Sequence, residues 1–286
     1  MNETINLMKA HTSVRRFTKE QISDKELRAI IDAGRAASSW KNFQSYSIIV
    51  VRSKEKKEAL FDLVPQEAIR QSSAFLLFVG DLNRAQKGVH MHTEDFYPEG
   101  TENLLISSVD AALAGQNTLL AAESLGYGGV IIGLVRYEAS KIAQLFNLPD
   151  YTYPVFGMAL GKPNQNHAVK PRLPYEAVVF EEEYCEQLSS VIEAYDRVQV
   201  SMLVREHRIL GASVWQPNLV RNRIKQLTNC LKKRNYKNKA ELSSVPKNER
   251  GKTWLYQLLP LSAVPMSASQ RYLTGLRVSG FPLWKM

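Results

Sequence analysis

The feature that most constrains this fold is the long helical pattern over residues 101–125. Apolar side chains recur through it at helical spacing: Leu104, Leu105, Val109, Ala112, Leu113, Leu119 and Leu120. Alanines between them allow another element to approach closely. A helix that is apolar on nearly every side has to be covered on several sides. We therefore expect it at the centre of the domain or at a subunit interface.

Three short apolar runs, at residues 46–53, 75–80 and 154–161, predict buried strands. A fourth strand is expected to end near Gly133, after a helix C-cap at Gly126. The glycines of this segment do not form a dinucleotide-binding fingerprint, because the spacing differs and the segment follows a helix. Buried strands alternating with helices predict a layered α+β or α/β domain.

Shorter helices are predicted before and between these strands in the sequence, and one of them has Ser23 as its N-cap. Their ranges are 2–9, 23–38, 54–63, 68–73 and 137–146. Residues 83–100 are expected to be irregular. His90 and His92 lie there, but two histidines without a defined third ligand do not predict a metal site.

Two polar segments carry the candidate chemistry. The first, HTSVRRF at residues 11–17, combines imidazole, hydroxyl and guanidinium donors that can meet a phosphate, although such a segment can also be ordinary solvated surface. The second places Lys170 and Arg172 between prolines. The chain has no P-loop, catalytic triad or carboxylate pair. Two cationic segments and a glycine-lined strand end therefore suit a planar, phosphorylated redox cofactor.

The charge is distributed unevenly. The chain of 286 residues has a formal net charge of +9, yet residues 1–199 hold 21 Lys and Arg against 25 Asp and Glu, whereas residues 200–286 hold 16 against 3. We predict a domain at 1–199 and an atypical basic tail at 200–286 that is poorly ordered or results from a shifted reading frame near Val200. A genuine basic extension that binds nucleic acid or an acidic surface is the competing interpretation.

The expected location is the cytoplasm, because the amino terminus lacks a hydrophobic signal region and no apolar run is expected to span a membrane. Cys185 and Cys230 lie far apart in the sequence and suggest neither a disulfide framework nor a zinc site.

Four ordered blocks resemble one known family: HTSVRRF at 11–17, AASSWKNFQSYSII at 36–49, AAESLGYGGVIIGLVR at 121–136, and PVFGMALGKP followed by VKPRLP within 154–174. Residues 2–199 are similar to the oxygen-insensitive nitroreductases of the flavin-dependent nitroreductase superfamily, and most similar to the NADPH-dependent group A branch. The resemblance implies an α+β fold with a mostly antiparallel central sheet flanked by helices. It also implies a homodimer with two FMN molecules at the subunit interface.

The resemblance further implies which residues bind the cofactor. They are His11, Thr12, Ser13, Arg15, Ser38, Ser39, Gln66, Ile131, Ile132, Gly133, Leu134, Lys170 and Arg172. The chemistry itself would belong to FMN, with no catalytic side chain and no metal. Thr12 stands where arginine is common in the family.

Each of these residues has an implied role. His11 and Ser13, together with Lys170 and Arg172, would hold the FMN phosphate, while Arg15 would face the pyrimidine edge and stabilise charge that appears on reduction. Gln66 would bond the ring, and the backbone of residues 131–134 would face its N5 edge.

Ser38 and Ser39 match a serine-rich loop that the family offers to the partner subunit's flavin. Trp40 and Lys41 depart from the small polar residues usual in that loop and would narrow the acceptor pocket.

The implied activity is FMN-dependent, ping-pong transfer of two electrons from NADPH or NADH to nitroaromatics, quinones or free flavins. Alternatives are a dedicated flavin reductase or NADPH oxidase, and a flavin-binding protein impaired in NADPH use by its tail. The expected partners are small-molecule acceptors and a second copy of the chain, with no membrane and no nucleic acid.

Overall fold

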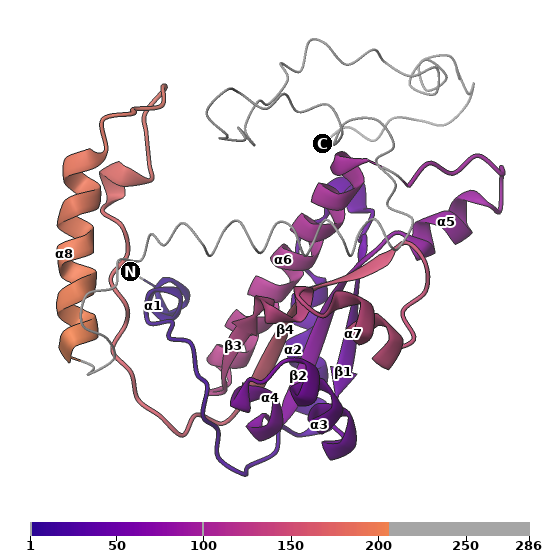
Figure 1. Ribbon diagram of the computed structural model, residues 1–286, viewed down its shortest axis with the longest axis horizontal. Helices are drawn as coiled ribbons and strands as arrows, with labels where there is room; N and C mark the ends of the chain where they lie inside the picture. Colours follow the sequence, from indigo (N-terminus) through magenta and orange to yellow (C-terminus); the bar gives the residue numbers. More distant parts are fainter. Residues whose placement is uncertain (1, 99, 206–286) are drawn as a thin grey trace, which may run out of the picture. The chain divides into compact units, whose positions relative to one another are not determined.

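The computed structural model describes residues 2–98 and 100–205, with a four-stranded antiparallel sheet at the centre (Figure 1). The strands are β1 (Tyr46–Val51), β2 (Ala74–Asp81), β3 (Gly128–Ile132) and β4 (Thr152–Gly161), arranged in the order β1-β2-β4-β3. Each neighbouring pair is antiparallel. The predicted α+β class, its antiparallel sheet and its apolar strands are confirmed.

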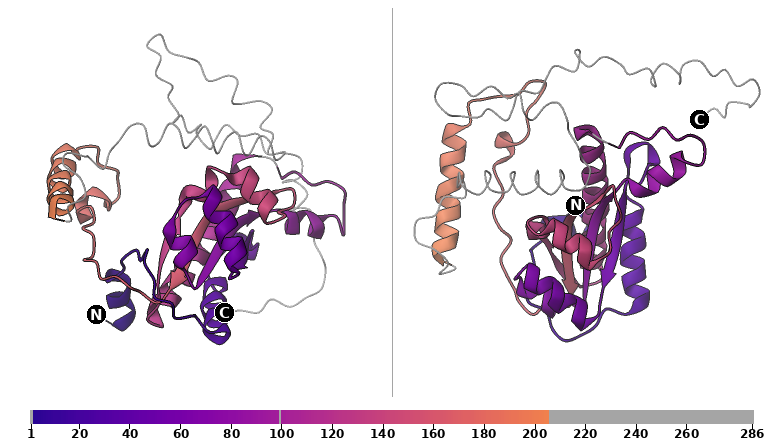
Figure 2. Two further views of the ribbon diagram at one scale, coloured as in Figure 1. Left: turned by 60° about the horizontal axis from the view of Figure 1, so that its bottom comes forward. Right: turned by 45° about the vertical axis from the view of Figure 1, so that its right-hand side comes forward.

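Helices cover both faces of this sheet (Figure 2). Helices α2 (Asp24–Arg35) and α6 (Thr101–Ser124) pack on one face, and α3 (Lys54–Leu63), α4 (Glu67–Gln71) and α7 (Ala139–Leu145) pack on the other. The remaining helices are α1 (Glu3–Lys9), α5 (Asn83–Val89) and α8 (Ser189–Arg205). Short 3₁₀ turns occur at Trp40–Asn42 (η1), Gly133–Arg136 (η2) and Tyr175–Ala177 (η3).

Strand β2 is apolar from Ala74 to Gly80 because both of its faces are buried there. Leu76 and Phe78 belong to the core on the side of α2 and α6, and Phe78 stacks on Phe156 with ring centroids 4.7 Å apart. Phe75 and Leu77 belong to the core on the side of α3, α4 and α7. Successive side chains of a strand point to opposite faces, so each core receives alternate residues.

Helix α2 begins at the predicted cap. The Ser23 hydroxyl accepts a hydrogen bond from the backbone N–H of Glu26, and the Glu26 carboxylate accepts one from the backbone N–H of Ser23. This reciprocal arrangement satisfies two N–H groups that have no partner within the helix. The helix ends at Arg35, short of the predicted residue 38.

Helix α6 has the predicted central position. It packs on α2 and the sheet, and its small residues Ala111, Ala114 and Gly115 are buried at these contacts. By length and composition alone it is also apolar enough to cross a bilayer, a property that core helices share. Its extensive packing against the sheet is nevertheless that of a core helix.

The hydroxyl of Tyr153 on β4 further fixes α6 to the sheet. It hydrogen-bonds the Ser107 and Ser108 hydroxyls, 2.9 and 2.7 Å away, and donates to the carbonyl of Leu104. Burial raises the pKa of Tyr153, and the bonds to the two serines partly oppose that rise. The hydroxyl is therefore neutral at physiological pH and able to serve as a buried donor.

Two helices lie outside the predicted pattern. Residues 83–100 were expected to be irregular, and this was wrong for Asn83–Val89, which form α5. Helix α5 buries no residue and has no side-chain cap, so neither apolar periodicity nor a start signal marks it in the sequence. Helix α8 was not predicted, and it runs across the proposed division after Gln199.

Replacing Gly157 on β4 with alanine should destabilise the fold. The new Cβ would lie 2.1 Å from Cζ of Phe75, a fully buried ring with little room to move. We expect urea denaturation, followed by circular dichroism, to give a free energy of unfolding lower by about 2 kcal/mol. Gly88→Ala in α5 is the control, because its Cβ would meet no atom within 4 Å. Equal stability of the two variants would contradict this packing argument.

Candidate functional site

Residues 11–17 lie beside the first residues of strand β3. The backbone N–H of Val14 donates to the carbonyl of Gly129 at 2.9 Å, and Phe17 forms an isolated β-bridge with Pro163. Val14 and Phe17 are buried in the core, which leaves Ser13 and Arg15 toward the solvent side. The apolar residues of this segment therefore fix the position of its polar residues.

Gln165 joins this segment to the loop that follows β4. Its side-chain amide donates to the carbonyl of Ser13 at 3.2 Å, and its amide oxygen accepts from the backbone N–H of Arg16 at 3.1 Å. The backbone N–H of Thr18 donates to the carbonyl of Lys162. These bonds bring together two cationic segments that lie about half the chain apart.

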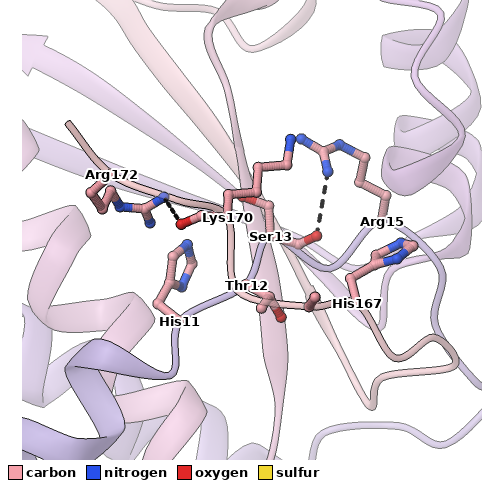
Figure 3. A pocket seen from close by; sticks show the side chains of 8 residues that line it. His11, Thr12, Ser13, Arg15, His167, Lys170 and Arg172 are labelled. Atoms are coloured by element: carbon pink, nitrogen blue, oxygen red, sulfur yellow. Dashed lines mark hydrogen bonds between the residues drawn. The ribbon is translucent and has the colours of Figure 1, made fainter. Parts of the chain in front are cut away.

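A pocket lies where the two segments meet (Figure 3). It is lined by His11, Thr12, Ser13, Arg15, His167, Ala168, Lys170 and Arg172. None of these eight residues is acidic, whereas five carry basic groups and two carry hydroxyls. Such a donor set matches a phosphate, whose oxygens accept several charge-assisted hydrogen bonds.

The two arginines of the pocket are oriented by backbone carbonyls. Nη1 of Arg15 donates to Ser13 at 3.3 Å, and Nη1 of Arg172 donates to Lys170 at 3.2 Å. In Figure 3 they flank the pocket from opposite sides, with Lys170 between them. Each guanidinium keeps further N–H groups that can reach an anion.

Glu123 near the end of α6 supports His11 from behind the pocket. Its carboxylate oxygen lies 2.5 Å from Nδ1 of His11, and the side chains are 11% and 25% exposed. This contact fixes the ring and leaves Nε2 as the nitrogen available to a ligand. Sequence reasoning missed Glu123 and His167. The histidine lies in the same loop as Lys170, but nothing local in the sequence links Glu123 to His11.

The structure does not bring all predicted cofactor-binding residues to this pocket. Ser38 and Ser39 follow α2 and precede β1, at the end of the sheet where β4 begins, whereas the pocket lies beyond the end of β4. Strand β4 has ten residues, which corresponds to roughly 30 Å. The serines and the pocket of one chain therefore lie at opposite ends of the sheet.

Gln66 and residues 131–134 also lie outside the pocket lining. Gln66 is exposed before α4, where its amide nitrogen donates to the carbonyl of Pro65. Residues 131–134 span the end of β3 and the start of η2.

The glycine at 133 gives room to a side chain of this same chain. A Cβ there would lie 2.9 Å from Nη2 of Arg136, and that arginine donates through Nη1 to the carbonyl of Val155 at 2.6 Å. The glycine therefore leaves room for the guanidinium of Arg136.

Within residues 2–98 and 100–205, no three His, Cys, Asp or Glu side chains gather closely enough to hold a metal ion. Cys185 is exposed and not in a disulfide, and Cys230 lies outside the described residues.

The sequence pattern of the Nitroreductase family matches residues 8–162, more than half of the chain. The chain belongs to the nitroreductase family. A second pattern, the C-terminal domain of the same family, matches residues 170–239. This match continues past Val200 into the segment that the sequence suggested is an atypical tail. The boundary between domain and tail after Gln199 stays a prediction.

Three curated relatives are similar to the chain over most of its length. The NADPH-flavin oxidoreductase of Vibrio harveyi is 42% identical, covering 75% of this chain and 88% of the relative. The FMN reductase [NAD(P)H] of Bacillus subtilis is 41% identical, covering 68% and 81%. The oxygen-insensitive NADPH nitroreductase of Salmonella typhimurium is 36% identical, covering 79% and 93%.

Two solved structures give the same assignment for the fold. Nitroreductase A from Vibrio parahaemolyticus superposes with a TM-score of 0.69 at 35% identity, covering 79% of this chain and 92% of that one. The hypothetical oxidoreductase YcnD from Bacillus subtilis superposes with a TM-score of 0.78 at 34% identity, covering 83% of this chain and 99% of that one. The nitroreductase-like fold expected from the sequence is confirmed.

Removing either cation of the second segment should weaken anion binding to the pocket. We expect Lys170→Ala and Arg172→Ala each to lower the affinity for inorganic phosphate about 5- to 10-fold, because each variant loses a charge-assisted contact. Isothermal titration calorimetry at low ionic strength measures this. Lys141→Ala is the control, since that lysine pairs with Glu138 and does not line the pocket. An equal loss in the control would mean that only net charge matters.

Proposed function

We propose that this protein is a homodimeric, FMN-dependent NAD(P)H oxidoreductase that reduces nitroaromatics, quinones or free flavins. The observation that carries the proposal is the wholly non-acidic, cationic pocket between residues 11–15 and 167–172. It occurs in a nitroreductase-family chain similar to an NADPH-flavin oxidoreductase and an FMN reductase over most of their lengths.

The donor chemistry of the pocket fits the phosphate of FMN. Two hydroxyls, two guanidiniums, an ammonium and two imidazoles can satisfy the oxygens of a phosphate dianion. Bound FMN would supply the electron transfer itself, from the nicotinamide to the acceptor.

The side chains of this chain bind and tune the cofactor. Lys170 and Arg172 neutralise the phosphate, with His11 held toward it by Glu123. Arg15 lies on the opposite side of the pocket from Arg172 (Figure 3). Its guanidinium would be available to the ring of FMN. A fixed positive charge there favours the ring after it has accepted electrons.

A second copy of the chain completes the site in this proposal. The loop with Ser38 and Ser39 lies at the far end of the sheet from the pocket, so it can reach a cofactor only in a partner subunit. Helix α6 offers a surface for pairing: Leu105, Val109 and Leu113 lie four residues apart on one side and are 53%, 52% and 43% exposed. Exposed apolar stripes of this kind favour association.

The remaining assignments rest on the sequence. We propose a cytoplasmic location. We also propose an atypical basic tail that follows the FMN-binding domain. Sequencing the gene and truncating the chain at residue 199 can test the boundary between the domain and the tail. Loss of FMN on truncation would mean that the later residues belong to the domain.

The proposed function is tested by flavin content and its reduction. The purified protein should absorb as oxidised flavin near 450 nm and bleach when NADPH is added without oxygen. Colourless protein that takes up no FMN would refute the proposal. Flavin that binds but does not bleach with NADPH or NADH would support the alternative of an impaired flavin-binding protein.

Arg15→Ala should affect reduction of bound FMN more than its binding. We expect the rate of reduction by NADPH in stopped-flow to fall about tenfold or more, because the charge acts mainly after electrons arrive. FMN affinity should change less. Arg16→Ala is the matched control, as this neighbouring arginine is exposed and outside the pocket lining. A large loss of FMN with an unchanged reduction rate would contradict the assigned role.

Val109→Asp should separate the proposed dimer. A carboxylate in the centre of an apolar interface would lose hydration without gaining a partner, at a cost of several kcal/mol. Sedimentation velocity should move from dimer to monomer. Val50→Asp on β1, another exposed valine, should remain dimeric. If the Val109 variant stays dimeric, α6 does not form the contact.

A further inference from the structure

The loop between α2 and β1 has a backbone that is costly for its sequence. Lys41, Asn42 and Gln44 all adopt positive φ, at 48°, 57° and 51°. Residues other than glycine seldom adopt this left-handed conformation, and each such residue costs on the order of 1 kcal/mol. Three of them within four positions persist only if surrounding contacts hold the loop.

Asp110, buried in the middle of α6, makes the main contacts. One carboxylate oxygen accepts from the backbone N–H of Trp40 at 3.0 Å. The other accepts from the backbone N–H and the hydroxyl of Ser45 at 3.0 and 2.8 Å. Asp110 is 1% exposed and Ser45 2%. A single buried carboxylate thus fixes both ends of the strained segment.

Arg84 of α5 fixes the same loop from the other side. Its Nη2 donates to the carbonyls of Gln44 and Tyr46, at 2.8 and 2.6 Å. Within the loop, the backbone N–H of Gln44 also donates to the hydroxyl of Ser39. The loop is therefore preformed rather than shaped by a ligand.

This fixed backbone presents two aromatic rings and a cation to solvent. Trp40 and Phe43 are 46% and 42% exposed and meet edge to face, with ring centroids 5.9 Å apart. Nζ of Lys41 lies 4.9 Å from the centroid of the Trp40 ring. Large exposed rings held rigidly lose little entropy when a planar ligand stacks on them, and the lysine adds attraction for negative charge.

We infer that the loop Trp40–Phe43 is a preformed stacking surface for planar, negatively charged electron acceptors, and that Asp110 is the positioning residue that maintains it. The inference rests on the proposed function, because the surface meets a flavin only in the proposed dimer. The inferred acceptors are aromatic anions. This class is narrower than the nitroaromatics, quinones and flavins of the proposed function. Trp40 and Lys41 select this class by stacking and by charge.

The experiment compares two acceptors with one ring and different charge, 4-nitrobenzoate and 4-nitrobenzamide. Lys41→Gln should lower kcat/KM for the benzoate about 3- to 10-fold and that for the amide less than about twofold, because only the anion loses an attraction. Trp40→Ala should lower both about 3- to 10-fold through lost stacking. Lys25→Gln is the charge-matched control, at the opposite end of α2.

Asp110→Asn tests the positioning role. The uncharged amide of asparagine cannot accept hydrogen bonds from both Trp40 and Ser45 as the carboxylate does. The ratio of kcat/KM for 4-nitrobenzoate to kcat/KM for 4-nitrobenzamide should therefore fall toward the value of Lys41→Gln. FMN content and the rate of bleaching by NADPH should remain close to the parent's. Since this buried variant can fail to fold, Ser45→Ala removes one of the three contacts and should shift the ratio in the same direction by a smaller factor. Asp32→Asn, an exposed aspartate of α2, should leave the ratio unchanged.

Three outcomes would overturn the inference. One is an unchanged ratio in Lys41→Gln. Another is a ratio of kcat/KM for the two acceptors that equals the parent's in both Asp110→Asn and Ser45→Ala. The third is a change in sedimentation of Trp40→Ala with unaltered acceptor kinetics, which would make the surface a subunit contact. Absence of bleaching by NADPH in the parent would instead refute the proposed function.

Discussion

The candidate site depends on the hydrogen bond from the backbone N–H of Val14 to the carbonyl of Gly129. This contact, with the burial of Val14 and Phe17, fixes residues 11–17 beside β3 and so determines where the imidazole, hydroxyl and guanidinium groups point. The glycine at 128 allows the approach, since a Cβ there would lie 2.6 Å from Cγ2 of Val14. The ordinary apolar packing of Val14 and Phe17 therefore determines how the polar residues beside them line the pocket.

Helix α6 connects this site with the opposite end of the sheet. Glu123 orients His11 at the pocket, and Asp110 holds the Trp40 loop. The two residues are thirteen positions apart, which is about 20 Å along the helix. Tyr153 fixes the same helix to β4. A rigid helix packed on the sheet can keep two distant groups at constant separation, which the proposed site between two subunits would require. Two acidic side chains of α6 thus position the two elements that are proposed to bind ligands.

The sequence predicted the elements whose signals are local. The strands and α6 followed from apolar runs and periodicity, and the start of α2 from the Ser23 cap. It missed α5, whose exposed surface carries no periodicity, although Arg84 of this helix fixes the loop before β1. It also missed Glu123, because its pairing with His11 joins residues far apart in the sequence. Long-range polar contacts of this kind leave no spacing or pattern that a single sequence can display.

Two groups of the residues inferred from family resemblance lie at opposite ends of the sheet. Those of residues 11–15 and 170–172 share one pocket, whereas Ser38 and Ser39 lie about the length of β4 away. A cofactor held at its phosphate end by the first group cannot be contacted by the second within one chain. Both groups can act on one flavin only if two chains pair with opposite ends of their sheets adjacent. The exposed apolar stripe on α6 is consistent with such pairing, because α6 carries both Glu123 beside the pocket and Asp110 beside the loop.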